Sequence, residues 1–169
     1  MMAAPAALPL LLPDVDGPLI PFRARTTAAT CDAGEAVRAA DQASGNPLID
    51  RLDAADGPRL LALGCQLVWA TTWMADANDI IAPRLGLPEL LVVEFADDDE
   101  PEHGLHWKTR FLTRWAAGRT FVWLDDELTD TDRRWVRIHH PGKALLHRVD
   151  PLVGLSDADY ASIGDWLAM

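Results

Sequence analysis

The sequence predicts an α/β fold in which one parallel sheet lies between two layers of helices. Short apolar stretches such as LPLLL, QLVWA, LLVVEF and TFVWL alternate along the chain with longer stretches that carry helix signals. This alternation is typical of parallel strands joined by crossover helices. The apolar stretches are also continuous, as strands are when both faces of their sheet are covered. Together these observations favour a three-layer, Rossmann-like architecture.

Each predicted element is bounded by residues that end strands or helices. Asp and Gly follow the first apolar stretch, and Gly64, Gly86 and Gly118 end three of the predicted helices. The predicted strands are 7–13, 66–70, 88–95, 120–127 and 143–150. The predicted helices are 48–63, 74–86, 105–118, a short one within 129–142, and 156–169, which Ser156 would cap.

Residues 20–46 have weak periodicity, many small residues and several turn formers. They predict a loop excursion, with or without a short helix near 33–42, that acts as a flap or minimal cap over the domain. The chain shows no repeat of solenoid length and no Gly/Ser-rich linker. We therefore interpret residues 1–169 as one domain, a length that suits a single hydrophobic core.

The composition indicates which classes of protein are favoured for this chain and which are not. Hydrophobic residues make up 49 % and charged residues 24 %, as in soluble globular proteins, and the net charge is −11. This acidity argues against strong non-specific nucleic-acid binding, which depends on Lys and Arg. Cys31 and Cys65 form no zinc pattern and are expected to be unpaired thiols. The N-terminus lacks the basic region of a signal peptide, so we expect a cytoplasmic protein without a membrane partner.

Polar residues gather where the predicted strands end. In an open parallel sheet, ligands bind outside the carboxyl ends of the strands. Lys108, near the start of the helix that precedes the fourth strand, can reach the same edge. The residues that directly follow or end strands here are Asp14, Asp16, Thr71, Thr72, Asp125, Asp126 and Glu127.

These residue types suit phosphoryl transfer. Several carboxylates close together repel one another unless a cation lies among them, and a hard ion such as Mg²⁺ prefers carboxylate oxygens. One carboxylate can attack phosphorus, and a second can move the proton of the leaving group and of water. Asp14 and Asp16 are two residues apart, so in a strand they share a face. A lysine and a threonine hydroxyl can stabilise the charge on the transferred group.

Four motifs resemble those of the haloacid dehalogenase-like (HAD) superfamily of phosphohydrolases, and they occur in the family's order. They are DVDGPL after an apolar strand, LVWAT with Thr71, HWK with Lys108, and FVWLDDE with Asp125 and Asp126. More narrowly, DVDGPLIPF, LVWATTWMADAN, VVEF, HWK and WLDDE are similar to the small HAD domain associated with RNA-repair proteins. The resemblance covers residues 8 to about 150.

The resemblance implies a role for each matched residue. Asp14 would be the nucleophile, and Asp16 the general acid/base with its backbone carbonyl on Mg²⁺. Thr71 and Lys108 would hold the phosphoryl group, with Gly17 and Thr72 beside it. Asp14, Asp16 and one or both of Asp125 and Asp126 would hold the metal.

The expected function is thus that of an Mg²⁺-dependent phosphatase that acts through an aspartyl-phosphate. A short cap leaves the site open to a nucleotide or nucleic-acid end phosphate, on which Trp73 or Trp107 would stack. The alternatives are a phosphatase of a small phosphorylated metabolite, a non-catalytic HAD-like binding or regulatory protein, and metal-free dehalogenase chemistry. A second subunit that covers the site would make the protein a homodimer.

Overall fold

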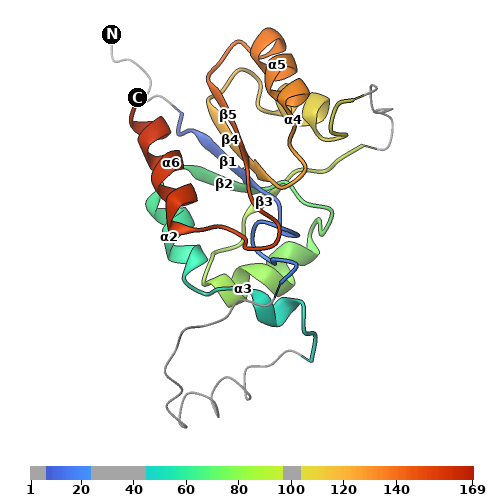
Figure 1. The fold of residues 1–169 in the computed structure, drawn as a ribbon, viewed down its shortest axis with the longest axis vertical. Coiled ribbons are helices and arrows are strands. Elements are labelled where there is room, and N and C mark those ends of the chain that lie inside the picture. Colours follow the sequence, from blue (N-terminus) through green and yellow to red (C-terminus); the bar gives the residue numbers. More distant parts are fainter. Residues whose placement is uncertain (1–6, 24–44, 97–103) are drawn as a thin grey trace.

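Parallel strands and helices alternate along the chain in a computed structural model, which describes residues 7–23, 45–96 and 104–169 (Figure 1). The strands are β1 (Leu10–Pro13), β2 (Gln66–Trp69), β3 (Leu91–Val92), β4 (Phe121–Asp125) and β5 (Ala144–Arg148). The helices are α2 (Asp56–Ala62), α3 (Ala82–Leu85), α4 (Thr109–Trp115), α5 (Asp130–His139) and α6 (Asp157–Ala168). A 3₁₀ turn, η1 (Ile49–Arg51), precedes α2, and a π-helical turn, η2 (Ala77–Ile81), leads into α3.

The five strands form one sheet in the order β3-β2-β1-β4-β5, and all pairings are parallel. The first strand is central. Its Leu11 lies opposite Leu67 of β2 on one side and Val122 of β4 on the other. The prediction of a parallel α/β sheet is therefore confirmed.

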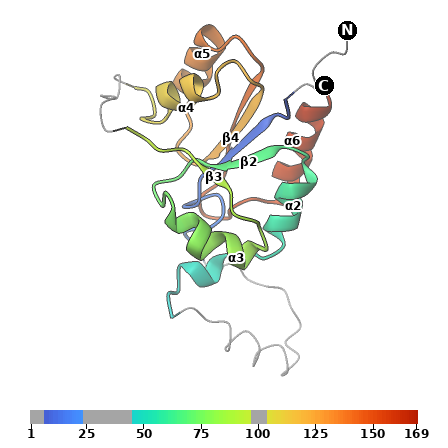
Figure 2. The same cartoon turned by 180° about the vertical axis from the view of Figure 1, so that it is seen from behind.

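Two apolar cores lie on the two faces of this sheet because successive strand residues point to opposite sides. Leu11 packs in the core covered by α2, α3 and α6, and Leu10 and Leu12 pack in the core covered by α4 and α5. Figures 1 and 2 show these two groups of helices on opposite sides of the sheet. Trp69 fills the first core and Trp123 the second, and both are fully buried.

The prediction of a helix over 48–63 is wrong for the first half of that range. The chain turns at Asp53, whose carboxylate accepts a hydrogen bond from the Ala55 backbone N–H, and α2 begins only at Asp56. Gly57 lies in its first turn, where a Cβ would come within 1.7 Å of the Leu85 carbonyl oxygen. The break agrees with Gly57-Pro58, a pair that can interrupt the helix predicted over 48–63, and close packing of Gly57 against α3 fixes the first turn of α2.

The third strand is shorter than the predicted 88–95. The Asn78 side chain accepts the Leu90 backbone N–H and donates to the Leu90 carbonyl, at 2.9 and 2.8 Å. Since both backbone groups of Leu90 are bonded to this side chain, they do not pair with a neighbouring strand. The helix predicted at 74–86 forms, but its first part is the π-helical turn η2.

The helix predicted at 105–118 starts later, at Thr109, with Lys108 as its N-cap. The two last helices agree with the sequence prediction. Ser156 caps α6: its side chain accepts from the Asp159 backbone N–H.

Residues 24–44 and 97–103 lie outside the described residues. Most of the predicted flap at 20–46, including its short helix near 33–42, and Cys31 therefore remain untested. Cys65 is a free thiol, and its partial burial raises its pKa. Among the described residues, no helix combines the length and the apolar character that a membrane crossing requires.

Candidate active site

The acidic residues predicted from the sequence meet at the point where the strand order reverses. From β1 the chain proceeds outward through β2 and β3, then returns to the other side of β1 with β4 and β5. Asp14 directly follows β1, and Asp125 is the last residue of β4, its neighbour. Ligand sites of open α/β sheets form at this switch point, outside the carboxyl ends of the strands.

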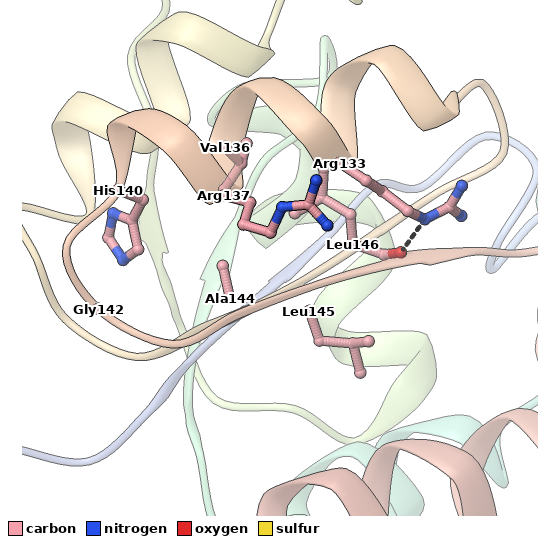
Figure 3. Close-up of a pocket in the computed structure, with 8 residues that line it drawn as sticks. All are labelled: Arg133, Val136, Arg137, His140, Gly142, Ala144, Leu145 and Leu146. Carbon is pink, nitrogen blue, oxygen red and sulfur yellow. Dashed lines mark hydrogen bonds between the residues drawn. The ribbon is translucent and has the colours of Figure 1, made fainter.

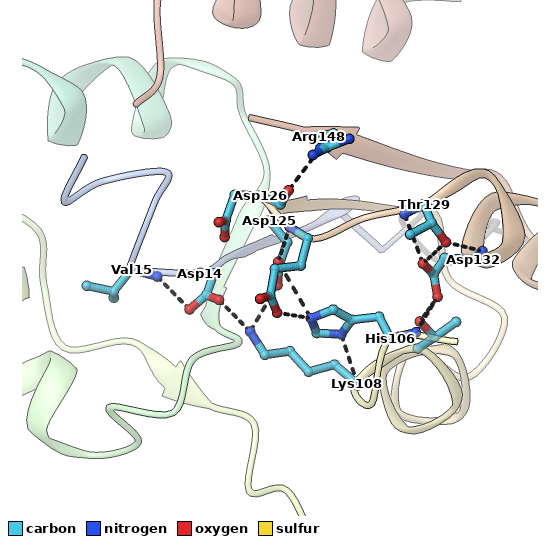
Figure 4. Close-up of polar contacts among 11 residues, drawn as sticks. Asp14, Val15, His106, Lys108, Asp125, Asp126, Thr129, Asp132 and Arg148 are labelled. Atoms are coloured by element: carbon cyan, nitrogen blue, oxygen red, sulfur yellow. Dashed lines mark hydrogen bonds and ion pairs between the residues drawn. The ribbon is translucent and has the colours of Figure 1, made fainter. Parts of the chain in front are cut away.

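Lys108 joins these two carboxylates (Figure 4). Its Nζ donates to Asp14 Oδ2 at 2.6 Å and to Asp125 Oδ2 at 3.0 Å. The lysine side chain is 2 % exposed and that of Asp125 is 1 % exposed. A buried charge is tolerated only when it is paired and hydrogen-bonded, so the three groups form one electrostatic unit.

Burial and pairing shift the pKa values of this unit in different directions. Burial raises the pKa of Asp14 to about 6, although the nearby Lys108 ammonium opposes this shift. Burial would also raise the pKa of Asp125, but the Lys108 charge and the hydrogen bonds from Lys108 and from the Glu127 backbone N–H outweigh it, so the pKa is lowered. For Lys108, burial favours the neutral amine, and the two carboxylates outweigh it, so the pKa is raised. The lysine therefore stays charged near neutral pH.

Asp126 adds a third carboxylate to the cluster. Oxygen atoms of Asp14, Asp125 and Asp126 all lie within 4.8 Å of one another. Burial, followed by the charges of Asp125 and Glu127, raises the pKa of Asp126. The backbone carbonyl of Asp126 accepts from Arg148 Nε at 2.9 Å, which anchors the turn after β4.

Gly17 makes room for Asp126. It has a φ of +90°, and a Cβ there would lie 2.7 Å from the Asp126 Cγ. Both the backbone conformation and the close approach exclude a side chain at this position. The glycine of the DVDG motif thus lets the loop after β1 lie directly against a carboxylate of the cluster.

We expect Gly17→Ala to lower the free energy of unfolding by about 1–3 kcal/mol and to weaken Mg²⁺ binding, because alanine strains the backbone and displaces Asp126. Gly64→Ala is the matched control. Gly64 also has a positive φ, +67°, but no atom lies within 4 Å of its Cβ position. Urea unfolding and calorimetric Mg²⁺ titration of both variants check this. Equal Mg²⁺ affinities in the two variants would contradict the contact with Asp126.

The loop before α4 is held in place by Asp132, a residue that the sequence analysis did not single out. Asp132 is fully buried in the first turn of α5. Its carboxylate accepts from the His106 backbone N–H at 2.8 Å, from Thr109 Oγ1 at 2.6 Å and from both the N–H and Oγ1 of Thr129. These hydrogen bonds lower its pKa against the effect of burial. Asp132 thereby fixes the position from which Lys108 enters the site.

The turn after β2 brings Trp73 to the loop after β1. The indole Nε1 of Trp73 donates to Asp16 Oδ2 at 3.0 Å. Thr71 is fully buried, and its hydroxyl accepts from the Trp73 backbone N–H at 3.3 Å. Met74, the next residue, has a φ of 50°, which non-glycine residues rarely adopt. Thr72 is exposed. The turn therefore connects two predicted site residues, Thr71 and Asp16, through one tryptophan.

Trp107 lies beside the lysine and is partly open to solvent. Its side chain is 39 % exposed, and Lys108 Nζ lies 5.4 Å from its ring centroid. Phe95 packs edge-on against it at 4.8 Å between centroids. A rigid aromatic surface thus borders the buried lysine.

The donor set fits a hard divalent cation. Asp14, Asp125 and Asp126 carry three negative charges when ionised, whereas Lys108 supplies one positive charge. Carboxylates that share a site resist ionisation unless a cation compensates them, and Mg²⁺ prefers such oxygen ligands. A second group, formed by His106, Asp125 and Glu127, also brings its ligand atoms within 4.8 Å of one another.

A separate pocket of about 310 Å³ lies between α5 and the edge strand β5 (Figure 3). Arg133 and Arg137 extend over it, and Arg133 Nε donates to the Leu146 carbonyl at 3.2 Å. None of its lining residues belongs to the carboxylate cluster.

Comparisons with protein-family models, with curated proteins and with solved structures find no match to this chain. The functional argument therefore rests on the residues and their geometry.

Proposed function

We propose that the protein is an Mg²⁺-dependent phosphatase of the HAD type that acts through an aspartyl-phosphate. The observation that carries this proposal is the buried Asp14–Lys108–Asp125 unit at the switch point of the sheet, with Asp126 beside it. It combines a carboxylate nucleophile, a fixed positive charge and a set of acidic metal ligands in one place.

The chain's own residues account for both half-reactions. A carboxylate oxygen of Asp14 attacks phosphorus, and the bond from phosphorus to the leaving oxygen breaks. Asp16 donates a proton to that oxygen, so an alcohol departs. Water then attacks the phosphorus of the aspartyl-phosphate and gives a proton to Asp16. The bond from phosphorus to Asp14 breaks, which releases inorganic phosphate and restores the Asp14 carboxylate and the protonated Asp16. Lys108 balances negative charge on the phosphoryl oxygens throughout.

Asp14, Asp125 and Asp126 are the side chains that would hold Mg²⁺, together with the backbone carbonyl of Asp16. When bound, the ion supplies positive charge that offsets the carboxylates and the phosphoryl group. Thr71 is proposed to contact a phosphoryl oxygen through its hydroxyl.

Trp73 is proposed to orient the general acid/base. Asp16 is exposed, so without a partner its carboxylate would sample several rotamers. The 3.0 Å hydrogen bond from the Trp73 indole restricts it. This contact gives Trp73 a role that does not depend on stacking with a substrate.

We expect Trp73→Phe to lower kcat for p-nitrophenyl phosphate by about 3- to 10-fold, because phenylalanine keeps the ring but lacks the N–H that holds Asp16. KM should change little. Trp166→Phe, in α6 and away from the site, is the control. A large rise in KM with unchanged kcat would instead indicate that Trp73 serves substrate binding.

The proposed substrate is a nucleotide or a nucleic-acid end phosphate. The partial exposure of Trp107 beside Lys108 supports it, because a base that stacks on this side chain would contribute about 1–3 kcal/mol. A comparison of kcat/KM for a sugar phosphate, a mononucleotide and a short phosphorylated oligonucleotide tests this. If the sugar phosphate is preferred by more than about tenfold, a small-metabolite phosphatase is the better description.

The decisive test of the reaction is turnover of p-nitrophenyl phosphate with Mg²⁺ and with EDTA. We expect turnover only with Mg²⁺. Binding of Mg²⁺ and phosphate without turnover of any phosphomonoester would favour a non-catalytic binding protein. Equal turnover with EDTA would exclude the metal-dependent mechanism.

A further inference from the structure

The imidazole of His106 contacts both halves of the proposed site. Its Nδ1 lies 3.1 Å from the Lys108 backbone nitrogen and accepts that N–H. Its Nε2 lies 3.3 Å from Glu127 Oε2 and 3.7 Å from Asp125 Oδ1. The ring therefore bridges the start of α4, which carries the lysine, and the end of β4, which carries the carboxylates (Figure 4).

The surroundings of the ring fix its position. The side chain is 5 % exposed, and the ring packs edge-on against Trp123 and stacks on Trp107, at centroid distances of 5.3 and 5.9 Å. Its own backbone N–H donates to Asp132. A ring held by packing on two sides, by a hydrogen bond at Nδ1 and by carboxylates facing Nε2 has one orientation.

The hydrogen bond at Nδ1 determines what Nε2 can do. A neutral imidazole has one donor and one acceptor nitrogen, so acceptance at Nδ1 places the proton on Nε2. Nε2–H then faces the carboxylates of Glu127 and Asp125, 3.3 and 3.7 Å away. A metal ion at Nε2 would need the lone pair that this tautomer lacks, which argues against a metal centre at His106, Asp125 and Glu127.

Glu127 transmits this contact to Asp125. The Glu127 backbone N–H donates to Asp125 Oδ1 at 3.0 Å, while Lys108 holds Asp125 Oδ2. Asp125 is thus oriented at both oxygens, and His106 contacts both groups that orient it: its Nδ1 accepts the Lys108 backbone N–H, and its Nε2 lies 3.3 Å from the Glu127 carboxylate.

We propose that His106 is a positioning residue that sets the spacing between Lys108 and the metal-side carboxylate Asp125. Nδ1 holds the Lys108 backbone, and Nε2 lies against the carboxylates of Glu127 and Asp125. This inference rests on the proposed phosphatase function only where kcat is measured. Its other two readouts, ring tautomer and Mg²⁺ affinity, do not require turnover.

Three variants separate the two contacts. His106→Asn keeps a short side-chain acceptor for the backbone N–H two residues on, but does not reach Glu127. His106→Gln places an amide N–H near the former Nε2, but loses the short acceptor. His106→Ala removes both. His139→Ala is the control, because His139 is exposed at the end of α5 and stacks on Trp135 outside the site.

We expect His106→Ala to lower kcat for p-nitrophenyl phosphate and to weaken Mg²⁺ binding, each by about 10- to 100-fold, as is typical when a partner of a metal ligand is removed. KM should stay within about 3-fold. The Asn and Gln variants should each recover part of both losses, and His139→Ala should match the wild type. Unchanged kcat and Mg²⁺ affinity in His106→Ala would overturn the proposal.

The metal-free wild-type protein provides a test that needs no variant to fold. Nitrogen-15 NMR of the neutral imidazole should show Nδ1 unprotonated and Nε2 protonated. The Nδ1–H tautomer would overturn the proposal. So would a Zn²⁺ or Mn²⁺ stoichiometry of two that falls to one in His106→Ala, since His106 would then be a ligand.

The outcomes also separate this inference from the proposed function. If no phosphomonoester is turned over, but the tautomer and the Mg²⁺ affinities are as expected, the phosphatase proposal fails and His106 retains its positioning role. If the wild type is an Mg²⁺-dependent phosphatase, but the tautomer is the other one, only the inference on His106 fails.

Discussion

Asp14→Asn is expected to reduce Mg²⁺-dependent turnover of p-nitrophenyl phosphate by roughly 10⁴-fold or more, as loss of a catalytic nucleophile typically does. The amide is nearly isosteric with the carboxylate, but it is a poor nucleophile and removes one negative charge from the proposed metal site. Circular dichroism and urea unfolding should show that the variant retains the fold, because Lys108 keeps its bond to Asp125.

Asp165→Asn is the control for this substitution, since Asp165 is exposed on α6. It should retain wild-type turnover. A second measurement is mass spectrometry of acid-quenched wild-type reactions, in which a phosphoryl group should be found on the peptide that contains Asp14. Turnover of Asp14→Asn within about tenfold of the wild type, or a phosphoryl group on a different peptide, would refute the nucleophile assignment.

The second large effect concerns stability. In EDTA, Lys108→Met should lower the free energy of unfolding by about 3–5 kcal/mol, because it removes the ammonium that pairs with Asp14 and Asp125 and leaves charged carboxylates behind. Both Lys108 and Asp125 are almost fully buried, so solvent does little to compensate the loss. Urea unfolding of the variant and the wild type measures the difference.

Two further measurements identify the cause of this destabilisation. Millimolar Mg²⁺ should recover part of it, because a cation among the carboxylates replaces some of the lost positive charge. The double variant Lys108→Met with Asp14→Asn should be more stable than Lys108→Met alone, because it has one fewer uncompensated carboxylate.

Lys143→Met is the control, since Lys143 is the chain's other lysine and is exposed in the turn before β5. It should change the free energy of unfolding by about 0.5 kcal/mol or less. If Lys108→Met behaves like this control, the lysine does not hold the carboxylates together.

The sequence by itself determined the sheet and its acidic edge. Continuous apolar stretches separated by helix signals required strands covered on both faces, and the structure contains that parallel sheet. Because parallel strands end at the same edge, Asp14 and Asp125 could be placed together from the positions of their strands alone. Their separation along the chain did not matter for this prediction.

Tertiary structure decided where several elements begin and end. Local sequence favoured one helix over 48–63. In the structure the helix begins at Asp56, and its first turn packs closely through Gly57 on the Leu85 carbonyl. The third strand is short because the Asn78 side chain bonds both backbone groups of Leu90. Contacts of this kind join residues distant in sequence, and no local pattern contains them.

The same distinction holds within the site. Residue types and order identified Asp14, Lys108 and Asp125, because their chemistry is recognisable from a short motif. The supporting residues His106 and Asp132 act through contacts that depend on where α4, α5 and the end of β4 meet. A histidine or an aspartate in a polar stretch has no sequence signal for such a contact, because its partner is fixed only when the elements pack. Sequence thus determined which groups carry the proposed chemistry, and tertiary structure decided which groups hold them at the required distances.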